Sequence, residues 1–455
     1  MIEVVAIDTP SLGDRGYLAT DGRVALVVDA QRDFDRVLSV AEDRGLTITH
    51  VVETHMHNDY VTGGYALAQV VGAQYLVNAA DPVGFGRTPV SDGDLFEVGQ
   101  MRVRAIATPG HTYTHLSYAL GDDQQMFAAF TGGSLLHGST GRTDLLGEQD
   151  KLALSRAQFA SAHRLAAELP DSAAIYPTHG FGSFCSATAT ASGPSTLGDE
   201  KRSNSALTSS EADYIAELLA GLDAYPAYYA HMGVANIAGP VAPDLAMPEP
   251  VKPGELRRRI DAGEWVVDLR SRTAFAVGHL RGALNFELGD GLATYLGWLI
   301  PWGIPLTLIG NTADEVADAQ RELCRIGIDQ IAGAASGPPA QWADGEGLES
   351  FVVTDFAGFA SFKERAAVVL LDVRRYGEWH EGHIEGAMHI PLHELDGRMA
   401  EIPDREIWVH CGAGYRAAVA ASLLAAQGRK VVAIDDDFSA AQGAGLTMAP
   451  GAPLT

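Results

Sequence analysis

A pattern of polar and glycine residues occurs twice in the second half of the chain. The first copy reads Trp-Val-Val-Asp-Leu-Arg at 265–270 and Gly-His-Leu-Arg-Gly-Ala at 278–283. The second copy reads Val-Leu-Leu-Asp-Val-Arg at 369–374 and Gly-His-Ile-Glu-Gly-Ala at 382–387. A strand ending in Asp-x-Arg and followed by Gly-His and Gly-Ala is too specific to recur by chance. The repeat predicts a duplicated α/β module, each copy a small parallel sheet flanked by helices.

The rest of the chain predicts one more domain before the repeat. Apolar strand patterns alternate with helical patterns over residues 1–240, and five prolines between 240 and 253 indicate a linker. We therefore predict three domains, at 1–240, 253–345 and 350–455. A chain of 455 residues is too long for a single hydrophobic core, which agrees with this division.

Charge and cysteine content narrow the class of protein. There are 32 Lys and Arg against 58 Asp and Glu, and the net charge of −26 disfavours nucleic acid and anionic membranes as partners. The sequence shows no apolar stretch of membrane-spanning length and no secretory signal. Only three cysteines occur, at 185, 324 and 411. So few cysteines predict no disulfide framework and a location in the reducing cytoplasm.

The loop that begins at Cys411 combines a thiol with groups that stabilise an anion. Residues 407–410 predict a strand and residues 416–424 a helix, so Cys411 lies near a helix N-terminus. Glycines let successive backbone N–H groups point inward, and Arg416 adds a positive charge. We predict that Cys411 is a nucleophile with Arg416 as its electrostatic partner, since a structural cysteine would need neither. The predicted persulfide cradle comprises Gly412, Ala413, Gly414 and Tyr415.

The first copy of the module lacks this chemistry. Its strand at 305–309 leads into Gly310, and Asn311 stands where the nucleophile is expected, with no arginine at the matching place. Residues 253–345 are therefore predicted to be catalytically inactive and to serve as a scaffold or docking surface. Cys324 follows in a helical pattern and is predicted to be core, whereas Cys185 receives no role.

Histidines and one carboxylate follow strand patterns in the first domain. His55, His57 and Asp59 come just after the apolar run at 47–53, and His111 and His179 each follow a later strand. A single histidine of this kind is more often structural, but four at strand ends favour a shared metal site. Imidazole and carboxylate ligands suit zinc or iron.

Residues 1–240 resemble the metallo-β-lactamase superfamily, whose signature is His-x-His-x-Asp-His. The resemblance is to its glyoxalase II and persulfide dioxygenase branch, through sequences at 108–112, 130–132, 141–145 and 196–204. It implies an αββα sandwich, and a dinuclear site in thioester hydrolases or a mononuclear iron site in persulfide dioxygenases.

Two positions depart from that family. Tyr60 replaces the last histidine of the signature, which removes a ligand of the second metal and disfavours a dinuclear hydrolase. Gly133 replaces the aspartate that, with two histidines, holds the iron of persulfide dioxygenases. His55 and His111 match those two histidines. Three outcomes stay open: His57 completes a three-histidine face, water replaces the aspartate, or the metal binds poorly.

We expect at most one Fe(II) or Zn(II) per chain, held by His55 and His111 with His57 favoured as the third ligand. Losing an anionic ligand should weaken metal binding relative to the family. His115 and His137 lie nearby in sequence but match no family ligand. The residues assigned to the surroundings of the metal, or to a lost ligand set, are Asp59, Tyr60, Gly133 and His179.

Residues 350–455 resemble rhodanese, whose active-site loop is Cys-x4-Arg, and residues 253–345 an inactive rhodanese. Related phosphatases have one more residue between Cys and Arg, so the shorter loop suits sulfur rather than phosphate. The whole chain thus resembles bacterial persulfide dioxygenase–sulfurtransferase fusions. That resemblance implies oxidation of a low-molecular-weight thiol persulfide at one metal, coupled to transfer of sulfur through a cysteine persulfide to or from thiosulfate.

The resemblance also implies an α/β protein in which a metallo-β-lactamase sandwich precedes two rhodanese-like domains with parallel sheets, and a homo-oligomer. Two alternatives are retained. In the first, the N-terminal domain only binds a persulfide or a partner and Cys411 alone does chemistry. In the second, the chain is a thioester hydrolase of the glyoxalase II type. Neither the carrier thiol nor the direction of transfer follows from the sequence.

Overall fold

Two six-stranded sheets form the first unit of this computed structural model, which describes residues 2–451 except 189, 191–192, 344 and 346. The unit comprises residues 1–244 with 324–327. In order across the first sheet the strands are β1 (Glu3–Thr9), β2 (Asp14–Thr20), β3 (Val24–Val28), β4 (Thr47–Val52), β5 (Gln74–Asn78) and β6 (Thr88–Val90). Across the second they are β12 (Ser195–Thr196), β11 (Ala174–Pro177), β10 (Met126–Gly132), β9 (Leu116–Gly121), β8 (Met101–Ala107) and β7 (Leu95–Val98).

The two sheets pack face to face, and alternate side chains of each strand point toward the other sheet or toward the helices. Successive residues of a strand face opposite sides of its sheet. In β3, Leu26 and Val28 pack into the core shared by the two sheets, whereas Ala25 and Val27 pack into the core on the helical side. Burying a side chain such as leucine or valine contributes about 1.5–3 kcal/mol. The apolar core between the two sheets therefore stabilises their packing against each other.

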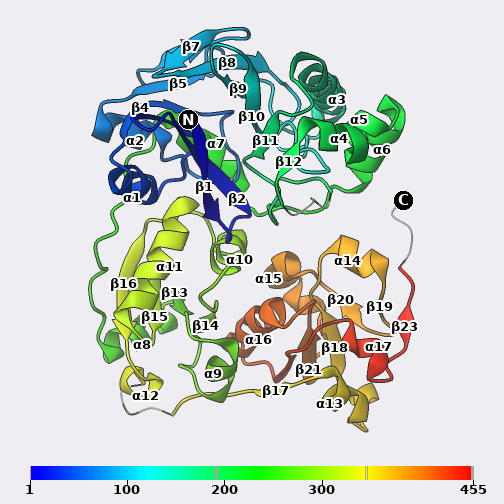
Figure 1. Ribbon diagram of the computed structural model, residues 1–455. Helices are drawn as coiled ribbons and strands as arrows, with labels where there is room; N and C mark the ends of the chain where they lie inside the picture. The colour runs from blue at the N-terminus through cyan, green and yellow to red at the C-terminus, as the bar shows by residue number, and fades with distance from the viewer. Residues whose placement is uncertain (1, 189, 191–192, 344, 346, 452–455) are drawn as a thin grey trace. The chain divides into compact units, whose positions relative to one another are not determined.

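Helices cover the outer face of each sheet, so the unit is an αββα sandwich (Figure 1). On the first sheet lie α1 (Asp35–Asp43), α2 (Gly64–Val71) and part of α7 (Tyr229–Ala238). On the second lie α3 (Lys151–Glu168), α4 (Leu197–Ser203), α5 (Ser205–Thr208) and α6 (Glu211–Ala220). This arrangement confirms the fold predicted for the first domain.

The second unit, residues 245–323 and 328–455, contains two parallel sheets. The first has the order β14 (Leu284–Asn285), β13 (Trp265–Asp268), β15 (Leu306–Gly310), β16 (Ile331–Ser336). The second has the order β17 (Val352–Thr354), β22 (Val431–Ile434), β21 (Ile407–His410), β18 (Val369–Asp372), β20 (Met388–His389). The two predicted α/β copies are therefore present, and both belong to one compact unit. The domain boundary between them stays a prediction.

Helices accompany both sheets, and a short antiparallel pair accompanies the second copy. The helices of the first copy are α8 (Pro253–Asp261), α9 (Arg272–Val277), α10 (Leu292–Leu299), α11 (Ala313–Arg325) and α12 (Pro339–Trp342). Those of the second are α13 (Phe356–Ser361), α14 (Tyr376–Glu381), α15 (Leu395–Arg398), α16 (Tyr415–Ala426) and α17 (Ala440–Gly443). The antiparallel pair is β19 (His383–Ile384) with β23 (Met448–Ala449).

The aspartate and the arginine of the repeated Asp-x-Arg motif form a buried ion pair in each copy. Arg374 donates two charge-assisted hydrogen bonds to Asp372, at 2.7 and 3.0 Å, and one to the Gly382 carbonyl at 2.8 Å. Arg270 makes the same bonds to Asp268 and to the Gly278 carbonyl. Removing one partner of such a buried pair costs about 3–5 kcal/mol. The motif therefore serves folding in both copies and does not mark an active site.

The repeated Gly-His is structural as well. His279 Nδ1 donates to the Phe275 carbonyl at 2.8 Å, and its ring stacks on Phe275 with centroids 3.9 Å apart. His383 repeats this arrangement with Trp379.

In the described part of the chain, no helix is long and apolar enough to cross a bilayer. The cytoplasmic location and the homo-oligomer stay predictions.

Candidate functional site

Cys411 lies between the end of β21 and the start of α16, as predicted. Its side chain is buried, with 2% of its surface exposed. The first backbone N–H groups of a helix have no partner within the helix and attract negative charge. Gly414 precedes α16 with φ of 88°, a left-handed conformation that glycine adopts without strain. The loop therefore has the backbone geometry that an anion-binding cradle requires.

Residues of the first copy brace this loop from within the same unit. A Cβ atom on Gly414 would collide with Asp435, whose carboxylate accepts a hydrogen bond from Arg272 at 2.9 Å. The Tyr415 hydroxyl donates to the Glu287 carbonyl at 3.2 Å, so this side chain points at the first copy. The first copy thus contacts the loop, in line with its predicted role as a scaffold.

The Arg416 guanidinium is bound to a carboxylate. Its Nη1 donates to Glu378 Oε2 at 2.5 Å and its Nη2 to Glu378 Oε1 at 2.7 Å. Glu378 belongs to α14 and lies 38 residues before Arg416 in the chain. The positive charge predicted beside Cys411 is therefore present, but it carries a negative partner that the sequence analysis missed.

In the first copy, the loop that matches the Cys411 loop is bound by the carboxylate of Glu315. The Asn311 backbone N–H donates to Glu315 Oε2 at 2.6 Å, and the Asn311 amide donates to Oε1 at 3.0 Å. Glu315 belongs to α11, the helix equivalent to α16. A carboxylate of the same chain thus accepts the hydrogen bonds of this loop.

We expect that a cysteine at position 311 would not revive the first copy. In a Cys411→Ser background, Asn311→Cys should leave thiosulfate:cyanide sulfur transfer at background. The reason is that Glu315 binds the loop and that no arginine stands at the position that matches Arg416. The measurement is thiocyanate release by the full-length double variant. Transfer clearly above that of Cys411→Ser alone would contradict the assignment of the first copy as inactive.

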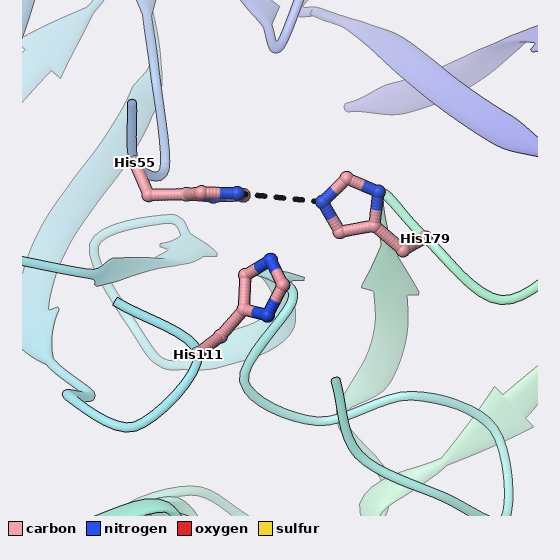
Figure 2. A group of neighbouring side chains, drawn as sticks. All are labelled: His55, His111 and His179. Atoms are coloured by element: carbon pink, nitrogen blue, oxygen red, sulfur yellow. Dashed lines mark hydrogen bonds between the residues drawn. The ribbon is translucent and has the colours of Figure 1, made fainter. Parts of the chain in front are cut away.

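Three histidines from different strand ends converge in the first unit. His55 follows β4, His111 follows β8 and His179 follows β11, and their nearest nitrogens all lie within 4.8 Å of one another. Figure 2 shows the rings turned toward a common centre, with His55 Nε2 and His179 Nε2 separated by 3.4 Å. All three side chains are buried. The structure therefore groups His179, rather than His57, with the predicted pair.

Hydrogen bonds fix which nitrogen of each ring faces the centre. His111 Nδ1 lies 2.8 Å from the Arg142 carbonyl, which can only accept, so Nε2 carries the lone pair. Thr54 donates its hydroxyl proton to Asp29 and so accepts from His55 Nδ1 at 2.9 Å. His179 Nδ1 lies 2.9 Å from Asp14. Anchoring one ring nitrogen in this way is typical of metal-binding histidines.

The protonation of two of these rings also fits a cation. Burial, with the neighbouring imidazoles, lowers the pKa of His55 well below its usual range and that of His111 to about 3, so both stay neutral. Burial alone would lower the pKa of His179, but Asp59 and Asp14 raise it well above its usual range, so this ring would have to release a proton to bind a metal ion. His111 Nε2 has no hydrogen-bond partner among the described residues. Such an orphaned, buried lone pair fits a metal ligand.

His57 is held by acidic residues outside this group. Its Nε2 lies 3.2 Å from Glu53, 3.3 Å from Asp29 and 3.0 Å from the Tyr60 hydroxyl. Burial would lower the pKa of His57, but Asp29 and Glu53 raise it to about 9. His57 belongs to two other groups of possible ligands, one with Asp59 and His179 and one with Asp29 and Glu53. The three-histidine face predicted with His57 is thus formed with His179 in its place, and the ligand set stays a proposal.

Asp29 anchors this region in an unusual backbone conformation. Its φ of 52° is the single positive value found among the described residues other than glycine. Its carboxylate accepts hydrogen bonds from the Thr54 N–H and the Thr54 hydroxyl, both at 2.7 Å. Strained residues of this kind persist where the surrounding contacts hold them, and they cluster at functional sites.

At Gly133, the space of the missing carboxylate is filled by a ligand ring. A Cβ atom there would lie 2.6 Å from His111 Cγ and 2.8 Å from His111 Nε2. The ring is also close to Gly141, where a Cβ would lie 2.8 Å from His111 Nδ1. Both glycines thus leave room for the His111 ring. An aspartate at 133 would require His111 to move, so this site is built around the glycine.

The other residues near the site have structural partners. His115 accepts a hydrogen bond from the Gly133 N–H at 3.1 Å and bonds Thr108 through its second nitrogen, and His137 bonds the Ile175 carbonyl.

The two other cysteines, Cys185 and Cys324, are both buried. Burial raises the pKa of Cys185 well above its usual range, with Asp59 and Asp14 adding to the shift. A thiol kept neutral in this way is a poor nucleophile.

Comparisons with known proteins agree with the two halves of the structure. Residues 358–444 match the family of rhodanese-like domains. The chain is similar to a crystal structure of a metallo-β-lactamase from Staphylococcus aureus, with 28% identity and a TM-score of 0.66, over 74% of this chain and 99% of that one. That alignment extends well beyond the first unit. It confirms the metallo-β-lactamase fold at the N-terminus.

Relatives of the N-terminal region belong to two kinds of enzyme. The human mitochondrial persulfide dioxygenase ETHE1 is 26% identical over 53% of this chain and 82% of its own length. A hydroxyacylglutathione hydrolase from Rhizobium etli is 41% identical, but over 21% of this chain and 38% of its own length. The chain thus spans well under half of that hydrolase. These findings confirm the resemblances inferred from the motifs.

Proposed function

We propose that this chain, in which a metallo-β-lactamase fold precedes a rhodanese-like domain, is an enzyme of sulfane-sulfur metabolism that carries sulfur as a persulfide on Cys411. The observation that carries the proposal is the buried cysteine at the end of β21, before the N-terminus of α16. It lies inside the segment that matches rhodanese-like domains. Persulfide dioxygenases among the relatives support sulfur as the substrate element.

The transfer at Cys411 has two steps. The thiolate attacks the outer sulfur of thiosulfate, a Cys–S–S bond forms, and the donor S–S bond breaks with its electron pair leaving on sulfite. A thiophilic acceptor such as cyanide then removes the outer sulfur as thiocyanate and restores the thiolate. The backbone N–H groups of the loop and the α16 dipole stabilise the negative charge in both states. Bracing of the loop by Asp435 and Glu287 keeps those groups in place.

We further propose that the N-terminal domain oxidises a low-molecular-weight thiol persulfide. His55, His111 and His179 would hold a single Fe(II) or Zn(II), which when bound would supply positive charge and an open position for an anionic sulfur. Zinc has no redox chemistry, so the oxidation requires iron. Overall, the conversion consumes dioxygen and water and releases the thiol and sulfite. Thr54, the Arg142 carbonyl and Asp14 orient the three imidazoles.

Two alternatives differ in the role of the first domain. A thioester hydrolase of the glyoxalase II type needs two metals, and Tyr60 and Gly133 offer no side chain of the expected kind. A domain that binds persulfide or a partner without chemistry is the stronger rival, because the site has lost its carboxylate. In that case Cys411 alone would be catalytic.

The deciding experiment combines metal analysis with two assays on the purified full-length protein. The proposal expects about one equivalent of iron after anaerobic loading. It also expects oxygen uptake with a thiol persulfide and thiocyanate release from thiosulfate and cyanide. Sulfur transfer without any oxygen uptake by the iron-loaded protein would favour the non-catalytic first domain. Absence of sulfur transfer would overturn the assignment of Cys411.

A further inference from the structure

The ion pair between Arg416 and Glu378 is largely buried. The Arg416 side chain is 12% exposed and that of Glu378 is 26% exposed. Both guanidinium contacts are charge-assisted and the pair is bidentate, which is the strongest geometry for such a contact. Burial would raise the pKa of Glu378, but Arg416 lowers it to about 2. The carboxylate is therefore charged throughout the neutral pH range.

The carboxylate is also held close to the nucleophile loop. Glu378 accepts the Arg375 N–H at 3.1 Å in the first turn of α14, which limits its rotation. A Cβ atom on Gly412 would lie 3.4 Å from Glu378 Oε1 and 3.0 Å from Arg416 Nη2. Gly412 follows Cys411 directly. A negative charge thus lies beside the backbone that receives the sulfur anion, at a distance where Coulomb energies are large.

We propose that Glu378 is a specificity-determining residue, which disfavours dianionic sulfur donors and so favours monoanionic donors such as thiol persulfides at Cys411. This inference rests on the proposed sulfur transfer at Cys411. The repulsion between a fixed carboxylate and a donor grows in proportion to the charge of the donor. Thiosulfate carries two negative charges, and a thiol persulfide carries one. Glu378 therefore raises the barrier for thiosulfate more than for a persulfide.

The test uses two donors of similar size and different charge, with cyanide as the acceptor. Thiosulfate is the dianion and methanethiosulfonate the monoanion, and both deliver their outer sulfur to a thiolate and release an anion. In Glu378→Gln, the ratio of kcat/KM for thiosulfate to that for methanethiosulfonate should rise about tenfold, the effect of about one elementary charge at an effective dielectric constant near 20 or above. Added salt should reduce the difference between the variant and the wild type.

Two further variants separate this effect from a loss of structure. Glu381→Gln removes the same charge from an exposed position in the same helix and should leave the donor ratio unchanged. Glu378→Asp keeps the charge and should keep a ratio near that of the wild type even if kcat falls. A merely structural role for Glu378 would lower kcat with both donors equally and leave the ratio unmoved.

The outcomes are distinct for the two proposals. If the wild type transfers sulfur but its donor ratio matches that of Glu378→Gln, the inference about Glu378 is overturned and the proposed function stands. If the wild type transfers sulfur from neither donor, the proposed function fails and the inference falls with it. A ratio that rises in Glu378→Gln and stays low in Glu378→Asp and Glu381→Gln supports the inference.

Discussion

Replacing Cys411 with serine should lower thiosulfate:cyanide sulfur transfer by at least about a thousandfold, to the background rate. A serine hydroxyl is a much weaker nucleophile than a thiolate, and it cannot form a persulfide. The side chain is buried and the replacement is nearly isosteric, so the fold should be retained. Thiocyanate release measures the effect, and thermal unfolding checks the fold.

The other two cysteines are the natural controls for this variant. Cys185→Ser and Cys324→Ser alter buried thiols outside the loop and should keep most of the transfer activity. Mass spectrometry after incubation with thiosulfate should find the added sulfur on Cys411 in the wild type. Activity that persists in Cys411→Ser would falsify the assignment of the nucleophile.

Replacing His111 with alanine should lower bound iron or zinc from about one equivalent per chain to below about a tenth. His111 supplies to the group a buried Nε2 that has no hydrogen-bond partner among the described residues, so its removal takes away one of the three converging nitrogens. Metal analysis after loading and desalting gives the result. His163→Ala, at an exposed histidine of α3, is the matched control and should bind as much metal as the wild type. Equal metal in His111→Ala would show that the metal binds elsewhere.

Restoring the family carboxylate should not restore the family site. Gly133→Asp introduces a Cβ within 2.8 Å of His111 Nε2 and so displaces a ligand ring. We expect metal content to stay level or fall, and thermal stability to fall, because the new side chain collides with a buried ring. A rise in both iron content and oxygen uptake would mean that the ring moves easily and that the glycine had only weakened an older site.

The fold was largely predictable because its signals are local. The alternation in β3 and the two copies of Asp-x-Arg with Gly-His each occupy a few consecutive residues. Their partners follow from strand geometry, and the αββα class followed from the resemblance that the motifs carry. The position of Cys411 between β21 and α16 was equally local, since a strand pattern, two glycines and a helix pattern adjoin it.

The charge environment of both sites could not be predicted in the same way. Glu378 reaches Arg416 across 38 residues, and His179 joins His55 across 124 residues. The local pattern marked His179 as a histidine at a strand end, but it did not show which histidine it would meet, and nothing in it distinguished Glu378 from a surface carboxylate. The spacing of His55 and His57 suggested a shared metal, yet Glu53 and Asp29 bind the second ring. Which imidazole joins the group depends on packing between the two sheets, and a linear pattern does not contain that information.

The carboxylate of Glu315 has a consequence for the evolution of the first copy. It is a competitor tethered to the loop that it fills, so its effective concentration is set by the chain and does not fall on dilution. A free sulfur anion at cellular concentration would have to displace a ligand that never diffuses away. If the first copy descends from an active module, as its predicted inactivity implies, occupation of this loop by Glu315 would keep external anions out even where a nucleophile were restored.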